Sequence, residues 1–500
     1  MADKTRQDPM LKRSDDMAHM MHYWEKADTV IDGIEAMRCK REKMLPRFTD
    51  ETTAEYDFRL STTKMTNVYH DTLESLAAKP FEEDVCLVND DDISPPEMLK
   101  EFAENVDGAG SNLTAFANQV FFNGINAAIS WIMIDYPDTS ALTGMPVSVA
   151  DARSMSIAPY WSIVLACNVI DVQSVMVMGA EVLSRFKIYE PGKPDHIREF
   201  VRADDGTVTW KLYEDKGKIV DEKTGTQFAE VSSGTVSIGR IPLVPFMTGR
   251  RNGRSWRFYP PMKAALELQV ELYQQESALK FAKTLTAYPM LAANGVNPPK
   301  EADNSVKNVK VGPGRVLYAP FDASGKAGSW AYVEPNSESL KFLAQDIKDA
   351  IDQLRELGRQ PLTAQSGNLT SITTGMAASK ARTVIKQWAL TLQNALENAF
   401  VMTLLYTSED VGGYDPSVYV FSEFDAFIDG KDLDALQADV LANRISLLTY
   451  WDEMQRRGVY GPDFTAEREQ KRLLDGLPSD NAPDMVDPVE EPLTSELNLP

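Results

Sequence analysis

Two long helical segments, separated by a turn-rich segment, dominate the second half of this 500-residue chain. The first helix is predicted from 262 to about 286, because a Pro-Pro pair precedes it and Pro289 follows it. The second is predicted over 337–357, where apolar residues recur at steps of 3, 4, 4 and 3. These residues are Leu340, Leu343, Ile347, Ile351 and Leu354. The second helix therefore has one continuous apolar side that must pack against another element.

The segments around these helices differ in composition. Residues 289–335 contain Pro, Gly and Asn throughout, with short β-forming runs such as RVLYAPF and SWAYVEP. Residues 361–375 contain no charged side chain, and a third long helix is predicted over 376–405. Shorter helices are predicted within 431–477. The last segment, 478–500, has five prolines and six acidic residues without a basic one, so we expect it to be disordered.

The first half of the chain combines helices with a β-rich region. Residues 1–16 are expected to form a flexible polar arm, and helices are predicted within 17–123. Strand-like runs separated by turn signals such as DDGT and EKTGT fill 127–247, which indicates mainly antiparallel β-structure. The predicted fold class is therefore α+β, mainly α, with a central antiparallel β region.

The chain is strongly acidic. The 51 Lys and Arg residues against 74 Asp and Glu residues give a net charge of −23, while 43% hydrophobic residues suffice for a folded core. Phosphate binding is supplied by Lys and Arg, so this chain is not expected to wrap nucleic acid with its whole surface. Two other interpretations remain: a small basic patch that binds DNA, or a surface past which DNA moves without binding.

Neither the cysteines nor the apolar segments indicate secretion or a membrane. The three cysteines, Cys39, Cys86 and Cys167, are far apart and have no ligand-like spacing, so a disulfide framework and a zinc site are both unexpected. The chain begins with polar MADKTRQDPMLKRSDD, which lacks the apolar core of a signal peptide. The most apolar stretch, 157–172, is too short and too polar to span a bilayer.

No catalytic, cofactor-binding or metal-binding motif is found. ASGKAG (323–328) lacks the glycine spacing and the following Ser or Thr of a Walker A loop, and neither G-x-S-x-G nor H-E-x-x-H occurs. His19 and His22 lie three residues apart on a predicted helix, but no further ligand lies nearby. We therefore predict no enzyme activity, no cofactor and no metal.

One basic cluster stands out, in TGRRNGRSWRFYPP (248–261). It places four arginines beside Trp256, Phe258 and Tyr259. The arginines are Arg250, Arg251, Arg254 and Arg257. Arginine interleaved with aromatic residues suits a phosphate contact and also a protein–protein interface, and in an acidic chain that must assemble we favour the interface.

The uncharged segment 361–375 also has two interpretations. It is rich in Thr, Ser, Gly, Asn and Gln and joins two strong helices, which fits a flexible surface connection. The second interpretation is a loop that faces a moving polyanion, because uncharged polar groups contact DNA without the strong grip of several arginines.

Taken in order, several stretches resemble the portal proteins of tailed bacteriophages. These are RFTDETTAEYDFRLSTTKMTNVYHDTLESLAAKPFEED (47–84), IGRIPLVPFMTGRRNG (238–253), PPMKAALELQVELYQQESALKFAKTLTAYPMLAANG (260–295), SWAYVEPNSESLKFLAQDIKDAIDQLRELGRQPL (329–362) and NRISLLTYWDEMQRRGVYGPDFTAEREQKRLL (443–474). The second contains an "IP-x-VPF" strand and the fourth a "YVEP-x-S" approach to a helix. The resemblance lies in the order of these elements and covers most of 47–474.

The resemblance implies the regions of a portal fold. They are an N-terminal wing (17–261), stem helices (262–288 and 336–360), a clip (289–335), a tunnel loop (361–375), the wing long helix with its return (376–430) and crown helices (431–477). In this family the tunnel loop points into the central channel. The implied DNA-facing residues are Thr363, Gln365, Asn368 and Thr370.

The resemblance also implies a function and partners. Portal proteins form a ring of twelve copies at one capsid vertex of the virion, after assembly in the cytoplasm of the bacterial host. Double-stranded DNA passes through this ring during packaging and ejection, without sequence specificity. The implied protein partners are the terminase motor, the tail adaptor that replaces it, and the major capsid or scaffold protein. No membrane is implied.

Two alternatives stay open. One is a different head-completion or adaptor protein, although such proteins are usually much shorter. The other is an enzyme, such as a metal-dependent hydrolase that uses scattered carboxylates, although no nucleophile–base or ligand constellation is present. An assembly of about twelve copies would favour the portal interpretation, and a stable monomer with substrate turnover would favour the enzyme.

Overall fold

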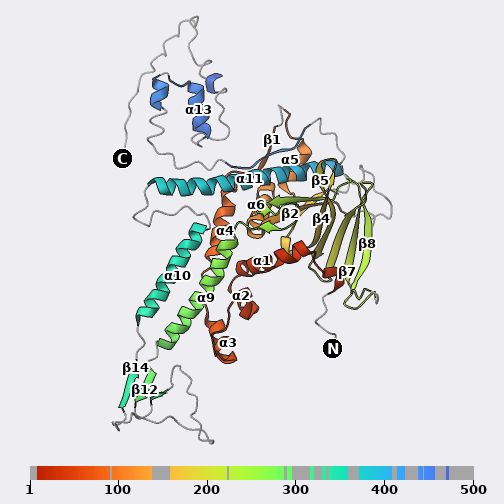
Figure 1. Ribbon diagram of the computed structural model, residues 1–500. Coiled ribbons are helices and arrows are strands. Elements are labelled where there is room, and N and C mark those ends of the chain that lie inside the picture. Colours follow the sequence, from red (N-terminus) through yellow and green to blue (C-terminus); the bar gives the residue numbers. More distant parts are fainter. Residues whose placement is uncertain are drawn as a thin grey trace, which may run out of the picture. The chain divides into compact units, whose positions relative to one another are not determined.

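The computed structural model has two units, Met1–Ser422 and Glu423–Pro500. The residues that it describes are 8–89, 93–137, 158–221, 224–286, 290–294, 316–319, 329–333, 337–357, 371–407, 414–422, 437–442, 444–456 and 469–471. Figure 1 shows their helices and strands. The predicted α+β class, with antiparallel sheets in the middle of the chain, is confirmed.

In the described part of the chain, six α-helices precede the main sheets. They are α1 (Asp15–Ile31), α2 (Ile34–Lys40), α3 (Thr53–Thr62), α4 (Val68–Ala78), α5 (Glu97–Glu104) and α6 (Leu113–Ala127). The helical sequence patterns over 17–44 and 53–78 are each interrupted in the structure. Gly33, with a φ of 85°, separates α1 from α2, because this left-handed conformation suits glycine and ends the helix. The chain between α3 and α4 is extended at Thr63, where ψ is 138°.

Two antiparallel sheets form the β region. The first has the order β3–β2–β9, and the second has the order β4–β5–β6–β7–β8. Their strands are β2 (Ile129–Asp135), β3 (Tyr160–Val164), β4 (Val169–Val177), β5 (Ala180–Glu190), β6 (His196–Arg202), β7 (Val208–Asp215), β8 (Phe228–Val236) and β9 (Leu243–Met247). The turn signal DDGT (204–207) connects β6 to β7, which pair in antiparallel register.

The two sheets share one hydrophobic core. Trp131 of β2 meets the ring of Phe186 of β5 edge-on, with ring centroids 4.6 Å apart, and both side chains are buried. Close packing also explains a glycine in α6, since a Cβ on Gly124 would lie 2.3 Å from the ring of Phe246 in β9. Burial of such large aromatic residues contributes strongly to core stability.

The expectation of a flexible arm over 1–16 is wrong for its second half, while residues 1–7 lie outside the described part. Residues 8–14 lie against the five-stranded sheet, and Asp15 begins α1. The Asp8 carboxylate accepts hydrogen bonds from Thr226 and from the backbone N–H of Gln227. Arg13 donates to the carbonyl oxygens of Val169 and Cys167. The local sequence of this segment is polar and could not predict partners so far away in the chain.

The predicted long helices of the second half are present. They are α9 (Lys263–Thr286), α10 (Ser337–Leu357) and α11 (Ser371–Thr407). Between α9 and α10 a small sheet has the order β13–β12–β14, with β12 (Met290–Asn294), β13 (Val316–Ala319) and β14 (Ser329–Val333). The helix α11 begins five residues earlier than the sequence suggested, so 371–375 is helical rather than part of a loop.

Among its described residues, the first unit also has two two-stranded sheets. One pairs β1 (Cys86–Val88) with β15 (Ser417–Tyr419), and the other pairs β10 (Arg250–Arg251) with β11 (Phe258–Tyr259). In the second unit, the described residues include a helical segment at 437–441 and α13 (Leu447–Arg456). Across the described parts of the chain, no helix is both long and apolar enough to cross a membrane. The expected tail, 478–500, lies outside them.

Candidate functional site

The helices α9 and α10 pack side by side and form a two-helix layer (Figure 1). Leu272 of α9 and Leu354 of α10 are fully buried in the cluster that joins them, together with Val68 of α4. Leu268, Ile347 and Ile351 pack against the same cluster. The apolar stripe predicted for α10 therefore faces α9, as its 3–4 spacing requires.

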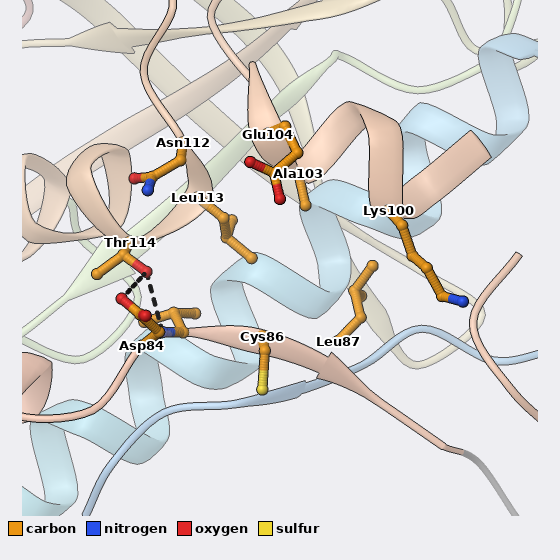
Figure 2. Close-up of a pocket in the computed structure, with 10 residues that line it drawn as sticks. Asp84, Cys86, Leu87, Lys100, Ala103, Glu104, Asn112, Leu113 and Thr114 are labelled. Atoms are coloured by element: carbon orange, nitrogen blue, oxygen red, sulfur yellow. Dashed lines mark hydrogen bonds between the residues drawn. The ribbon is translucent and has the colours of Figure 1, made fainter. Parts of the chain in front are cut away.

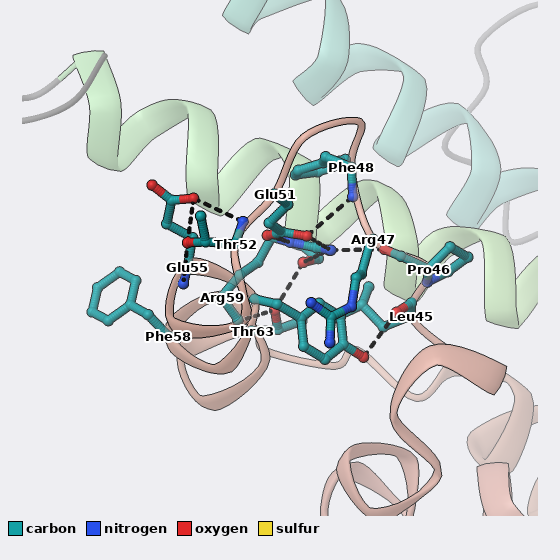
Figure 3. A network of polar contacts seen from close by, with 12 residues as sticks. Leu45, Pro46, Arg47, Phe48, Glu51, Thr52, Glu55, Phe58, Arg59 and Thr63 are labelled. Atoms are coloured by element: carbon teal, nitrogen blue, oxygen red, sulfur yellow. Dashed lines mark hydrogen bonds and ion pairs between the residues drawn. The ribbon is translucent and has the colours of Figure 1, made fainter. Parts of the chain in front are cut away.

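A buried ion pair ties α9 to the N-terminal helices (Figure 3). The guanidinium of Arg59 in α3 and the carboxylate of Glu51 are only 2% and 3% exposed, and their closest N–O distance is 2.7 Å. Arg59 also donates to the carbonyl oxygen of Pro46 at 2.7 Å and to Ser277 Oγ of α9 at 3.2 Å. Because each buried charge has several partners, the cost of removing it from water is offset.

The environment of Glu51 favours its charged form. Burial alone would raise the pKa of this carboxyl, but hydrogen bonds from Arg59 and from the backbone N–H of Phe48 outweigh it and hold the pKa below its usual range. The Arg59 guanidinium also lies over the Phe48 ring, 4.0 Å from its centroid. Glu51 and Arg59 thus form a charged, fixed contact under α9.

The break between α3 and α4 is filled by polar side chains of α9. Gln269, which is fully buried, donates to the carbonyl oxygen of Thr66 at 2.9 Å and accepts from the backbone N–H of Tyr69 at 3.0 Å. Glu276 accepts from the Thr66 backbone N–H, and Ser277 Oγ is 2.9 Å from Thr63 Oγ1. Backbone groups that lose their helical partners are thereby satisfied, so α9 can dock in one register only.

The other side of α10 has a different character. Its side chains opposite the stripe are exposed, and Phe342 is 69% exposed. The exposed charged residues are Lys341, Lys348, Asp349, Asp352, Arg355 and Glu356. Arg355 lies 3.8 Å from Asp352, and Gln345 donates to Asp349 at 2.7 Å. Thus α9 is anchored in the body of the unit, while α10 offers a long charged surface.

The third long helix, α11, packs against the sheet β3–β2–β9 (Figure 1). The Trp161 indole N–H of β3 donates to Thr403 Oγ1 at 2.8 Å, and its ring contacts the Phe400 ring at a centroid distance of 4.8 Å. The side chains that α11 exposes within 383–407 are mostly uncharged. They are Thr383, Lys386, Gln387, Leu390, Asn394, Asn398 and Leu405.

The expected channel residues lie outside the described part of the chain. They are Thr363, Gln365, Asn368 and Thr370. The assignment of these four residues to a DNA channel therefore stays a prediction from the sequence.

The four arginines of 248–261 occupy a hairpin made by β10, β11 and the turn between them. Arg251 donates to both oxygens of Glu181, at 2.8 and 2.9 Å, and lies 4.0 Å over the Trp256 ring. Its hydrogen bond lowers the pKa of the Glu181 carboxyl. Arg257 donates to Asp16 of α1 at 2.6 Å. These two arginines hold the hairpin onto its own chain.

The remaining two arginines of this cluster are Arg250 and Arg254, whose side chains are exposed. The predicted basic cluster therefore has two parts. Arg251 and Arg257 bind their own chain, and Arg250 and Arg254 are exposed. An interface or phosphate contact through the exposed part stays a prediction.

A surface pocket of about 370 Å³ lies between β1, α5 and the start of α6 (Figure 2). Thr114 Oγ1 donates to the Asp84 carboxylate at 3.3 Å and accepts from the Val85 backbone N–H at 3.1 Å. Burial, together with the charges of Asp84 and Glu83, raises the pKa of the Cys86 thiol at this pocket. A protonated thiol is a poor nucleophile, so the pocket offers no activated sulfur.

The described residues also contain no candidate metal-binding site. No group of three or more His, Cys, Asp or Glu side chains in them could hold a metal ion. His19 and His22 lie on α1 with exposed side chains.

Sequence reasoning missed the polar contacts that position α9. Gln269 and Ser277 stand on its buried side, where a helix normally carries apolar residues. Polar residues at core positions of a long helix were the available signal, since buried polar groups need specific partners. The partners themselves, Arg59 and the Thr63–Thr66 break, lie more than 200 residues away and could not be found by spacing.

Comparisons with known proteins give matches to one sequence family and to solved structures. The family described as "Domain of unknown function (DUF4055)" matches residues 261–407, which include α9, α10 and α11. No curated protein matches the sequence.

Two solved structures are similar to the chain over most of its length. A chain in "Neck of empty GTA particle computed with C6 symmetry" has 10% identity and a TM-score of 0.42, with 88% of this chain and 98% of that chain covered. A chain in "Neck of native GTA particle computed with C12 symmetry" has 11% identity and a TM-score of 0.37, with 82% and 90% covered.

Proposed function

We propose that this chain is a portal-type structural subunit, without enzyme activity, that forms a ring at one capsid vertex of a phage-like particle. Double-stranded DNA would pass through the ring during packaging and ejection. The terminase motor and later the tail adaptor would dock on it, and the capsid or scaffold protein would surround it. The proposed subunit number of twelve comes from the family resemblance.

One observation carries this proposal, namely the asymmetry of the two-helix layer. The helix α9 is anchored by the buried contacts of Arg59, Gln269 and Ser277, whereas α10 packs through its apolar stripe. At 1.5 Å per residue the two helices are about 36 and 32 Å long, which is enough to line a passage. A rigid rod that presents a charged outer surface suits lateral assembly into a closed ring.

The electrostatics of the chain support a channel for DNA. The net charge of −23 means that a ring of these subunits would repel DNA rather than bind it tightly. A channel wall needs weak contacts because the polymer must move along it. The exposed acids of α10, Asp349, Asp352 and Glu356, are consistent with such a wall.

Purified protein should assemble into particles of about 670 kDa, twelve times the 55.7 kDa chain. Mass photometry measures this mass directly, and negative-stain images should show rings with a central hole. A species that stays monomeric at micromolar concentration, under all salt conditions, would refute the proposed function.

A further inference from the structure

Basic side chains predominate on one flank of the two-helix layer, and acidic side chains predominate on the other. The helices α9 and α10 run antiparallel, because each adjoins one of the antiparallel strands β12 and β14, which follow α9 and precede α10. Leu272 of α9 lies beside Ala350 and Leu354 of α10, and this contact gives the position of one helix relative to the other along their length. The layer therefore has two long flanks, and the side chains of each flank follow from the helical repeat.

The basic residues of α10 lie on one flank, which also carries the exposed Asp352, 3.8 Å from Arg355. At about 100° per residue, Lys341, Lys348 and Arg355, spaced seven apart, lie within about 40° of one another. Viewed from the N-terminus of α10, they lie about 80–120° clockwise from the centre of its apolar stripe. Asp346 and Asp349 lie about 100° and 160° anticlockwise. The three basic side chains and Asp349 are exposed, and Asp346 is half-buried.

The exposed acids of α9 lie on the flank of Asp346. Viewed from the N-terminus of α9, Glu271 and Glu267 lie about 80° and 120° anticlockwise from the centre of the stripe formed by Leu268 and Leu272. For antiparallel helices that face each other, the same sense of rotation leads to the same flank. Glu267 and Glu271 are exposed. We call Glu267, Glu271 and Asp346 the acidic flank, and Lys341, Lys348 and Arg355 the basic flank.

We propose that the acidic flank of one copy contacts the basic flank of the next copy, and that this contact closes the ring. The proposal rests on the proposed function and names its subunit interface. A ring needs two different, complementary surfaces on each subunit, and the two flanks provide them on opposite sides of one rigid layer. A two-fold dimer would instead bring two like-charged flanks together, so the charge pattern selects head-to-tail assembly.

The heights of the charges agree with this contact. Since Leu272 lies beside Ala350 and Leu354, Glu271 is roughly level with Arg355, and Asp346 is nearly level with Lys348 on the same helix. Neighbours in a ring are related by rotation about the ring axis, which leaves heights along the axis unchanged. In a ring whose axis runs along the layer, opposite charges thus meet at two heights, about 10 Å apart, or seven residues of α10.

Charge reversal tests this interface. The pair Glu267→Lys with Glu271→Lys makes both flanks basic, and the pair Lys348→Glu with Arg355→Glu makes both acidic. Each variant alone should need at least ten-fold more protein than the wild type to form rings, as measured by mass photometry at low salt. An equal mixture of the two should restore rings in which the variants alternate, which native mass spectrometry resolves with tags of different mass.

The controls separate the interface from folding and from function. Glu101→Lys with Glu104→Lys changes the charge equally at exposed positions of α5, outside the layer, and should leave assembly unchanged. Unchanged circular dichroism melting curves would show that the reversed variants fold. If the wild type forms rings and the reversed variants do too, or if their mixture fails to restore rings, the interface is refuted while the function stands. A monomeric wild type would refute both.

Discussion

Replacing Arg59 with methionine should lower the free energy of unfolding by about 3–5 kcal/mol, the range for breaking a buried ion pair. The substitution keeps much of the side-chain volume but leaves the Glu51 carboxylate, only 3% exposed, without its cation. It also removes the donors to Pro46 and Ser277. Urea denaturation, monitored by circular dichroism, measures the loss.

A matched exposed arginine provides the control. Arg41 pairs with Asp57, and both side chains are about half exposed. Arg41→Met should therefore lower the free energy of unfolding far less than Arg59→Met, as expected for a surface ion pair. If Arg59→Met cost as little as Arg41→Met, the buried pair would not hold α9 in place.

The same pair gives the wild type an acid-side pH dependence. The folded-state pKa of Glu51 is lowered, so its contribution is fully present above the unfolded-state pKa of about 4.3. It is lost as pH falls through the folded-state value, because the carboxyl then takes up a proton and gives up its charge. The double variant Arg59→Met, Glu51→Gln, which has no charge to lose at this site, should show a shallower decline of stability over that pH range.

Replacing Thr363, Gln365, Asn368 and Thr370 together with aspartate should leave ring assembly intact and reduce packaged DNA at least ten-fold. The prediction follows from the proposed channel position of 361–375. Four new carboxylates on every copy would line the channel with negative charge that repels the phosphate backbone. Nuclease-protected DNA per particle measures packaging, and mass photometry measures the ring.

A conservative variant serves as the control for this experiment. Thr363→Ser, Gln365→Asn, Asn368→Gln and Thr370→Ser together keep the segment uncharged and should package normally. Loss of the ring in the aspartate variant would show that the segment is needed for assembly instead. Normal packaging with aspartate would remove the segment from the DNA path.

The long helices could be predicted from the sequence because helical periodicity is local. The steps of Leu340, Leu343 and Ile347 give the face of α10 without knowledge of its partner, and the prolines near 261 and 289 bound α9. The antiparallel β region was predictable for the same reason, since turn residues and alternation act over a few positions. The portal resemblance likewise rested on the order of such local elements.

Interactions between distant residues could not be predicted in this way. The sequence by itself determined which segments are helix or strand, and that α10 has one apolar side and one charged side. Only the tertiary structure decided that residues 8–14 bind the five-stranded sheet, that Arg251 and Arg257 bind their own chain, and on which flank of the layer each charge lies. The physical reason is that periodicity is encoded by neighbours along the chain, whereas the partner of a buried or paired charge is set by contacts across it.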